Sequence, residues 1–153
     1  MNPIRVTAPA DPVVSVFELR EHLRISGNDS DMQLQTLERA AVAHLDGWRG
    51  VLGRCILPQT WRVFLPAGTI HLPFPDVTAV EGAEWSPDYR YVTMAAAGPV
   101  EFTCALPEDA LDAVKDAIRI WVQMRYDGLS GPERDAYQDA FNSLISPLRW
   151  IGV

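Results

Sequence analysis

The fold of this chain is decided by Asp29–Trp61, DSDMQLQTLERAAVAHLDGWRGVLGRCILPQTW. Apolar side chains recur in it at spacings of three and four, which is the stripe of an amphipathic helix. The stripe consists of Leu34, Leu37, Ala41, Leu45, Trp48 and Leu52. Gly53 follows the last of these, where a left-handed residue often ends a helix. We therefore predict one long helix over 30–52. Gly47 and Gly50 weaken its last turns, so an end one turn earlier is the alternative.

Shorter helical patterns lie on both sides of this stretch. Ser15 and Glu18 have the spacing of a capping box, which predicts the start of a first helix. Pro107 and Pro132 stand before two further apolar stripes, and proline is tolerated in the first turn of a helix. The predicted helices cover 15–24, 30–52, 107–127 and 132–146.

Between the second and third helices the apolar pattern changes to alternation, which is typical of strands. Trp61 and Val63 point one way, and Arg62 and Phe64 point the other. The predicted strands are 60–65, 69–72, 77–85, 89–94 and 100–105. The sequence therefore predicts an α+β protein, a bundle of about four helices with a long central helix and a small antiparallel β-sheet inserted over 59–105.

The predicted helices and sheet form a single domain over 15–147. Several prolines precede this domain and disfavour a helix, so we expect an extended N-terminal arm over 1–14. Pro147 stops the last helix, which leaves a short C-terminal tail over 148–153.

Charge and composition narrow the function classes. The chain has 153 residues, a formal net charge of −7 and a single lysine, Lys115. Proteins that grip nucleic acid through phosphate contacts need clustered basic side chains, so the acidic balance disfavours that class. The N-terminal segment lacks an apolar signal-peptide core, and no run approaches the roughly 18 apolar residues of a membrane span. We expect a protein made in the cytoplasm.

No pattern of catalytic or metal-binding residues stands out. His22, His44 and His71 lack the spacing of metal ligands. Acidic side chains at the predicted helix starts are explained by the helix dipole. The sequence therefore predicts no catalytic residue, no cofactor, no metal site and no enzymatic activity.

Two cysteines are present and lie far apart in the sequence. Cys55 and Cys104 do not have the spacing of a metal or redox pair. They can meet within the sheet as a disulfide, but we favour two buried thiols.

The C-terminal tail carries side chains that are unusual for a free chain end. Leu148, Arg149, Trp150 and Ile151 follow a helix-stopping proline, and an untethered terminus normally frays. Tryptophan and arginine often carry the binding energy of interfaces. We therefore predict that this segment docks on a partner, and the alternative is that it folds back on its own domain.

The order of short motifs along the chain resembles a known family. A short helix, an acidic turn and a long Ala-rich helix are followed by a Gly-Arg pair, a Gln-Thr-Trp run and a closing Leu148-Arg149. The most specific part consists of Gly53, Arg54, Gln59, Thr60 and Trp61. In this order, from about Val14 to Arg149, the chain is similar to the head–tail connector (adaptor) proteins of long-tailed bacteriophages and gene transfer agents.

This resemblance implies a structural virion protein that forms a dodecameric ring below the portal protein. The ring would extend the DNA exit channel and offer a platform for the next neck or tail protein, a stopper or tail terminator. DNA would pass through without specific binding, and no membrane is involved. The resemblance also implies that Leu148–Ile151 reaches the portal, and that particles containing the ring are assembled in the bacterial cytoplasm.

The residues leave an alternative function open. A short helix, a turn and a longer helix can imitate a helix-turn-helix, so a small helical regulatory or DNA-binding protein is the second hypothesis. The net charge of −7 argues against it.

Overall fold

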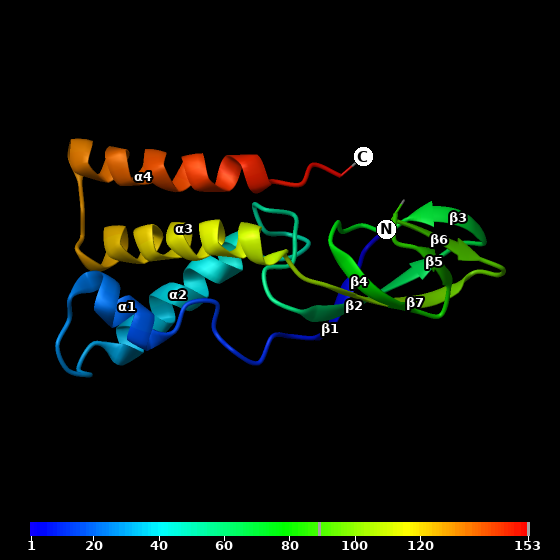
Figure 1. Cartoon of the computed structure of the whole chain (residues 1–153), viewed down its shortest axis with the longest axis horizontal. Helices are drawn as coiled ribbons and strands as arrows, with labels where there is room; N and C mark the ends of the chain where they lie inside the picture. Colours follow the sequence, from blue (N-terminus) through cyan, green and yellow to red (C-terminus); the bar gives the residue numbers. More distant parts are fainter. Residues whose placement is uncertain (89, 153) are drawn as a thin grey trace. The chain divides into compact units, whose positions relative to one another are not determined.

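The computed structural model describes residues 1–88 and 90–152, in which the chain forms four α-helices and seven strands (Figure 1). By compactness the chain divides into two units. The sheet unit contains Met1–Ala10, Asp46–Pro107 and the chain end from Trp150, and the helical unit contains Asp11–Leu45 and Glu108–Arg149. Each unit is described below by itself.

The helical unit contains all four α-helices. They are α1 (Val16–Leu23), α2 (Asp31–Leu45), α3 (Glu108–Tyr126) and α4 (Gly131–Ile145), followed by the 3-10 turn η1 (Ser146–Leu148). Figure 1 shows α3 and α4 running side by side in opposite directions. The capping box at α1 is confirmed, because the Glu18 amide donates to Ser15 Oγ and the Ser15 amide donates to the Glu18 carboxylate.

Helix α2 ends at Leu45, well before the end of the helix predicted over 30–52. The residues beyond it fold onto the sheet unit instead of continuing the helix. Gly47 takes a left-handed conformation with φ of 77°, and its amide donates to the carbonyl of Arg54 over 2.8 Å. Leu52 is fully buried, but from a loop, so its helical spacing from Leu45 is coincidental.

The sheet unit is built on two antiparallel sheets. The first has the strand order β1 (Ile4–Thr7), β2 (Gln59–Leu65), β7 (Gly98–Cys104) and β4 (Val77–Glu81). Strand β2 pairs with β7 along its whole length, from Gln59 opposite Cys104 to Leu65 opposite Gly98. The N-terminal segment expected to be an extended arm therefore contributes an edge strand to this sheet.

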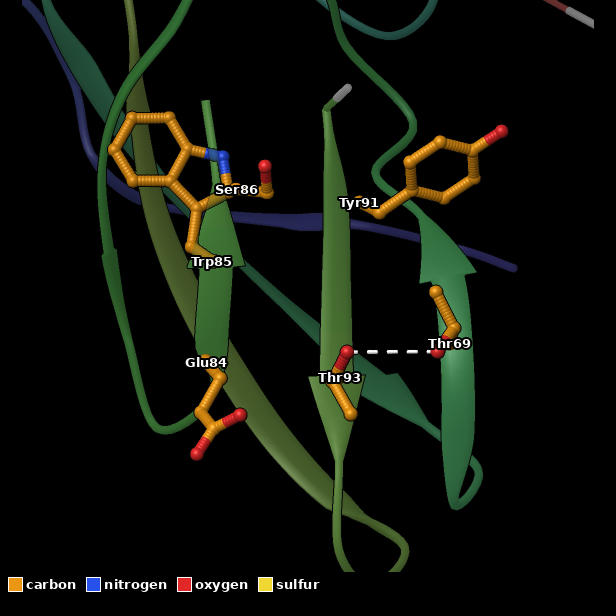
Figure 2. Close-up of a pocket in the computed structure, with 6 residues that line it drawn as sticks. All are labelled: Thr69, Glu84, Trp85, Ser86, Tyr91 and Thr93. Atoms are coloured by element: carbon orange, nitrogen blue, oxygen red, sulfur yellow. Dashed lines mark hydrogen bonds between the residues drawn. The ribbon is translucent and has the colours of Figure 1, made fainter. Parts of the chain in front are cut away.

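The second sheet has the strand order β3 (Gly68–His71), β6 (Tyr91–Met94) and β5 (Glu84–Ser86). In Figure 2 the hydroxyls of Thr69 and Thr93 face each other from neighbouring strands, 3.4 Å apart. The strand predicted over 77–85 is split at Gly82 into β4 and β5, which belong to different sheets. Part of the strand predicted over 89–94 forms β6, and Tyr89 lies outside the described residues.

The prediction of a helical bundle with a small inserted sheet is wrong. The chain has a sheet-rich α+β fold, in which strands from the N-terminus and from the middle of the chain form two sheets with their own core. Two features of the sequence explain the wrong prediction. The helix predicted over 30–52 includes residues that belong to the sheet unit, and the N-terminal strand is too short to show an alternating pattern. The predicted domain boundaries remain a prediction.

Aromatic side chains form the centre of the sheet unit's core. Phe74 is 1% exposed and packs against Trp61, with ring centroids 5.0 Å apart, and against Phe102 at 5.9 Å. The remaining buried members are Cys55, Val63, Leu65, Leu72, Val92, Met94, Val100 and Cys104. A core of this size gives the sheet unit its own hydrophobic driving force.

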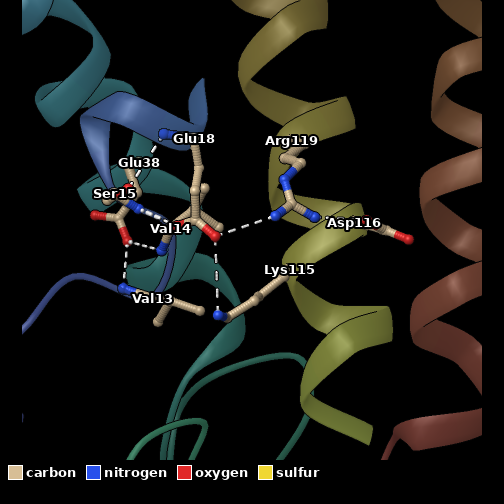
Figure 3. Close-up of polar contacts among 8 residues, drawn as sticks. All are labelled: Val13, Val14, Ser15, Glu18, Glu38, Lys115, Asp116 and Arg119. Carbon is tan, nitrogen blue, oxygen red and sulfur yellow. Dashed lines mark hydrogen bonds and ion pairs between the residues drawn. The ribbon is translucent and has the colours of Figure 1, made fainter. Parts of the chain in front are cut away.

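Two carboxylates fix the start of the helical unit (Figure 3). Glu38 on α2 is 4% exposed and accepts hydrogen bonds from the amides of Val13 and Val14, over 2.8 and 3.3 Å. Burial raises the pKa of Glu38, and the two amide donors only partly oppose this. In Glu18 the hydrogen bond from the Ser15 amide lowers the pKa, with Lys115 and Arg119 adding to the effect.

Replacing Glu38 tests how much its hydrogen bonds to the Val13 and Val14 amides stabilise the chain. Glu38→Ala leaves two buried amides without an acceptor, so we expect the free energy of unfolding to fall by about 1–3 kcal/mol. Glu38→Gln keeps an acceptor oxygen without the charge and should lose less. Chemical denaturation of both variants, with the wild-type chain alongside, measures these changes.

The difference in stability between Glu38→Gln and the wild-type chain should depend on pH in a defined direction. The folded chain holds the Glu38 proton more tightly than the unfolded chain does, so the stabilisation from this group is complete below its ordinary pKa of 4.5 and declines as the pH rises through the raised value. The stability of Glu38→Gln relative to wild type should therefore increase as the pH rises from 4.5. A constant or decreasing difference would contradict this assignment.

Candidate partner-binding site

The C-terminal tail is seated on the sheet unit through Trp150. The Trp150 amide donates to the carbonyl of Leu52 over 2.7 Å, which is a short and well-formed backbone hydrogen bond. Trp150 is half-buried, whereas Ile151 is 82% exposed. The tail therefore has one anchored aromatic residue followed by one apolar side chain that faces solvent.

Gly53 makes room for this tail. Its φ is 61°, in the left-handed region, and a Cβ built on it would lie 2.8 Å from the carbonyl oxygen of Trp150. Any other residue at position 53 would combine backbone strain with a clash against the tail. Gly53 thus has a direct structural relation to the predicted docking segment.

Arg90 lies over the aromatic ring of Trp150. Its guanidinium carbon lies 4.5 Å from the centroid of the Trp150 ring, within the range of a cation–π interaction. The carbonyl of Arg90 accepts a hydrogen bond from the Leu72 amide over 3.3 Å, which ties this residue to the end of β3. Nothing in the local sequence around Arg90 signals this contact.

Residues 46–57, which we call the seat loop, are organised around the carboxylate of Asp46. Asp46 accepts hydrogen bonds from the amide of Ile56 over 2.8 Å and from Gln59 Nε2 over 2.9 Å. Its side chain is 6% exposed and also pairs with Arg5 of β1 over 3.5 Å. The carboxylate therefore connects the two ends of the seat loop through Ile56 and links the loop to the first sheet through Gln59 and Arg5.

The other residues of the predicted family motif also have structural partners. Arg54 forms a bidentate pair with Asp76, with distances of 2.7 and 2.9 Å. The Thr60 hydroxyl lies 3.1 Å from that of Thr103 across the β2–β7 pair. Trp61 is 8% exposed in the core, and its ring would lie 3.1 Å from a Cβ on Gly47.

A disulfide joins the seat loop to the first sheet. Cys55 and Cys104 are bonded, with their Cα atoms 5.9 Å apart, and both are fully buried. The Leu106 amide donates to the carbonyl of Cys55 over 2.8 Å, just beyond the end of β7. The preference for two buried thiols is therefore corrected, because the fold brings the two sulfurs together.

The structure brings together only part of the predicted site. Gly53 and Trp150 meet directly, whereas Gln59 bonds to Asp46, Thr60 faces Thr103 of β7, and Trp61 lies in the core. Leu148 is half-buried in η1, and Arg149 is exposed. Sequence reasoning missed Leu52, Arg90, Asp46 and Asp76, because each acts through a partner distant in sequence.

The described residues do not form a group of three or more His, Cys, Asp and Glu side chains able to hold a metal ion. Within the same residues, none of the helices combines the length and apolar character needed to cross a bilayer. A shallow pocket of about 340 Å³ lies on the second sheet, lined by Thr69, Glu84, Trp85, Ser86, Tyr91 and Thr93. Figure 2 shows these side chains on the three strands of the second sheet, and four of the six carry a hydroxyl group.

Comparison with solved structures finds the same fold in a particle-associated chain. The match is to a chain described as "Neck of empty GTA particle computed with C6 symmetry", with a TM-score of 0.69. The alignment covers 100% of this chain and 97% of that chain, at 20% sequence identity. At 20% sequence identity, this structural likeness shows only that the two chains share a fold. No protein-family model and no curated protein sequence matches the chain.

The fit between Gly53 and Trp150 can be tested with a matched glycine. Gly128 has a φ of 60°, almost the same as Gly53, but a Cβ there meets nothing within 4 Å. Alanine at either position should introduce backbone strain of about 1–2 kcal/mol, and only Gly53→Ala should also displace the tail.

We therefore expect Gly53→Ala to lower the free energy of unfolding more than Gly128→Ala and to shift the indole N–H resonance of Trp150. That resonance can be assigned from its loss in Trp150→Phe. Equal destabilisation by the two alanines, with an unmoved Trp150 signal, would show that Gly53 does not fit the tail.

Proposed function

We propose that this chain is a structural protein of the neck of a phage-like or gene transfer agent particle, in the position of a head–tail connector. The observation that carries the proposal is the fold match to a neck chain, which extends over 100% of this chain. The order of the sequence motifs supports the same class independently of the match.

The connector proposal includes a ring of identical subunits. The particle of the neighbour was computed with C6 symmetry, and copies related by that symmetry occur in multiples of six. The dodecamer implied by the sequence resemblance corresponds to two such sets. A cyclic ring requires a heterologous interface, in which two different surfaces of the chain meet.

The charge distribution suits a channel through which DNA slides. The helical unit carries fourteen of the twenty acidic side chains and eight of the thirteen basic ones, so nearly all of the net charge of −7 belongs to it. On α4, Glu133, Asp135 and Asp139 are exposed. Such a surface repels phosphates rather than binding them. The same charge opposes the alternative of a DNA-binding regulator.

We propose that Leu148–Ile151 contacts the portal protein, with different roles within the segment. Trp150 is held by the seat loop and Arg90, so it anchors the tail to its own subunit. Ile151 is 82% exposed next to this anchor and supplies apolar surface for the partner. An anchored segment loses less conformational freedom on binding than a frayed one does.

The ring proposal is tested by mixing the purified chain with the portal protein of the same genome. We expect co-sedimentation of the two proteins and rings in negative-stain images of the mixture. A chain that stays monomeric with portal present, and never sediments with it, would overturn the proposal.

The tail is tested with variants that separate anchoring from docking. Deleting residues 148–153 should leave the chain folded but abolish portal binding. Ile151→Asp keeps the Trp150 anchor, so it should change the free energy of unfolding by no more than about 0.5 kcal/mol and still abolish binding. Met32→Asp is the matched control, because Met32 is 81% exposed on α2. Portal binding that survives Ile151→Asp would remove this residue from the interface.

A further inference from the structure

The disulfide is placed where it controls the seat loop. Cys104 is the last residue of β7, an inner strand of the first sheet, and faces Gln59 of β2 and Val77 of β4. Cys55 lies in the seat loop, two residues after Gly53. The bond therefore connects an inner strand, paired on both sides, to the loop on which the tail rests.

The seat loop is also held by non-covalent contacts, among them the ring of Trp48 against Phe74 and the ring of Trp61 beside Gly47. Its hydrogen bonds include those of Asp46 within the loop and to Gln59, the pair between Arg54 and Asp76, and the backbone bond from Leu106 to Cys55. The disulfide adds a covalent tether between Cys55 of the seat loop and Cys104 of β7. Without it, the loop and the tail seated on it should open more often.

The sheet unit can also accommodate the reduced form. Cys104 Sγ lies 4.0 Å from the carbonyl oxygen of Gln59, so a Cys104 thiol would have a weak acceptor in place. Both cysteines remain small apolar side chains in a packed core when reduced. We therefore expect the reduced chain to keep its fold, so that the redox state acts on the loop.

We propose that the Cys55–Cys104 disulfide is a redox-controlled pin that tightens the seat of the C-terminal tail after the subunit leaves a reducing compartment. The proposal rests on the proposed function, because a particle assembled in the cytoplasm and then released passes from a reducing to an oxidising environment. The thiol form permits the tail to be rearranged during assembly, and the disulfide form fixes it afterwards.

The chemistry is thiol–disulfide exchange with a small-molecule disulfide such as oxidised glutathione. Local opening of the loop exposes Cys55, whose thiolate attacks the oxidant, breaks its S–S bond and releases one glutathione thiolate. The Cys104 thiolate then attacks the mixed disulfide on Cys55, forms the protein disulfide and releases the second glutathione. The two cysteines lose two electrons and two protons in total, and the oxidant is reduced to two thiols.

Tryptic cleavage of the full-length chain after Arg149 tests the coupling between the disulfide and the tail. This cut releases a peptide that starts at Trp150, which mass spectrometry quantifies over time. We expect cleavage to be about tenfold slower after treatment with oxidised glutathione than in dithiothreitol. Cleavage after Arg24, the left-handed cap of α1 in the helical unit, is the internal control and should not change.

Two variants complete the test. Cys55→Ser should be cut at the fast rate under both conditions, and Trp150→Ala should be cut fast whether or not the disulfide is present. Two free thiols after oxidation, or equal cleavage of the oxidised and reduced chains after Arg149, would overturn the proposal. The assay needs neither ring nor portal, so its failure is distinguishable from a failure of the connector function.

Discussion

The structure depends on the buried carboxylate of Asp46, at the point where the chain leaves the helical unit and enters the sheet unit. Its bonds to the Ile56 amide and to Gln59 Nε2 stabilise the turn away from the helical path after Leu45. A buried carboxylate needs such donors, because an unpaired one would carry a large desolvation cost. The seat loop, the start of β2 and the position of Cys55 all follow from this one set of hydrogen bonds.

Local rules were sufficient where a residue and its partner lie a few positions apart. The capping box of Ser15 and Glu18 and the alternation around Trp61 were read from the sequence and are present in the structure. The end of α2 was not readable in this way, because Leu52 continues the helical spacing from Leu45 while packing from a loop. The periodicity shows which positions are apolar. Long-range contacts determine whether those positions lie in a helix, a strand or a loop.

The candidate site likewise combines residues that the sequence identifies with contacts that only the folded structure reveals. The apolar tail and the glycine at position 53 were both singled out from the sequence, but their contact depends on three-dimensional structure. Arg90 lies 60 positions before Trp150, and its cation–π contact has no local signal. The sequence permits both a disulfide and two buried thiols for a similar reason, since Cys55 and Cys104 are 49 positions apart and meet only in the folded sheet unit.

Fold-back of the tail and docking on a partner do not exclude each other. Among the described residues, Trp150 is held by a backbone hydrogen bond to Leu52 and a cation–π contact with Arg90, each of which contributes about 0.5–1.5 kcal/mol in a partly solvated setting. Contacts of that strength orient the tail without fixing it irreversibly. The exposed Ile151 is then presented from a defined position, so a partner gains apolar contact at a smaller entropic cost than it would with a frayed end. The disulfide adds a second, covalent restraint on the same loop. Under the proposed redox control, the chain would assemble with an adaptable tail and function with a fixed one.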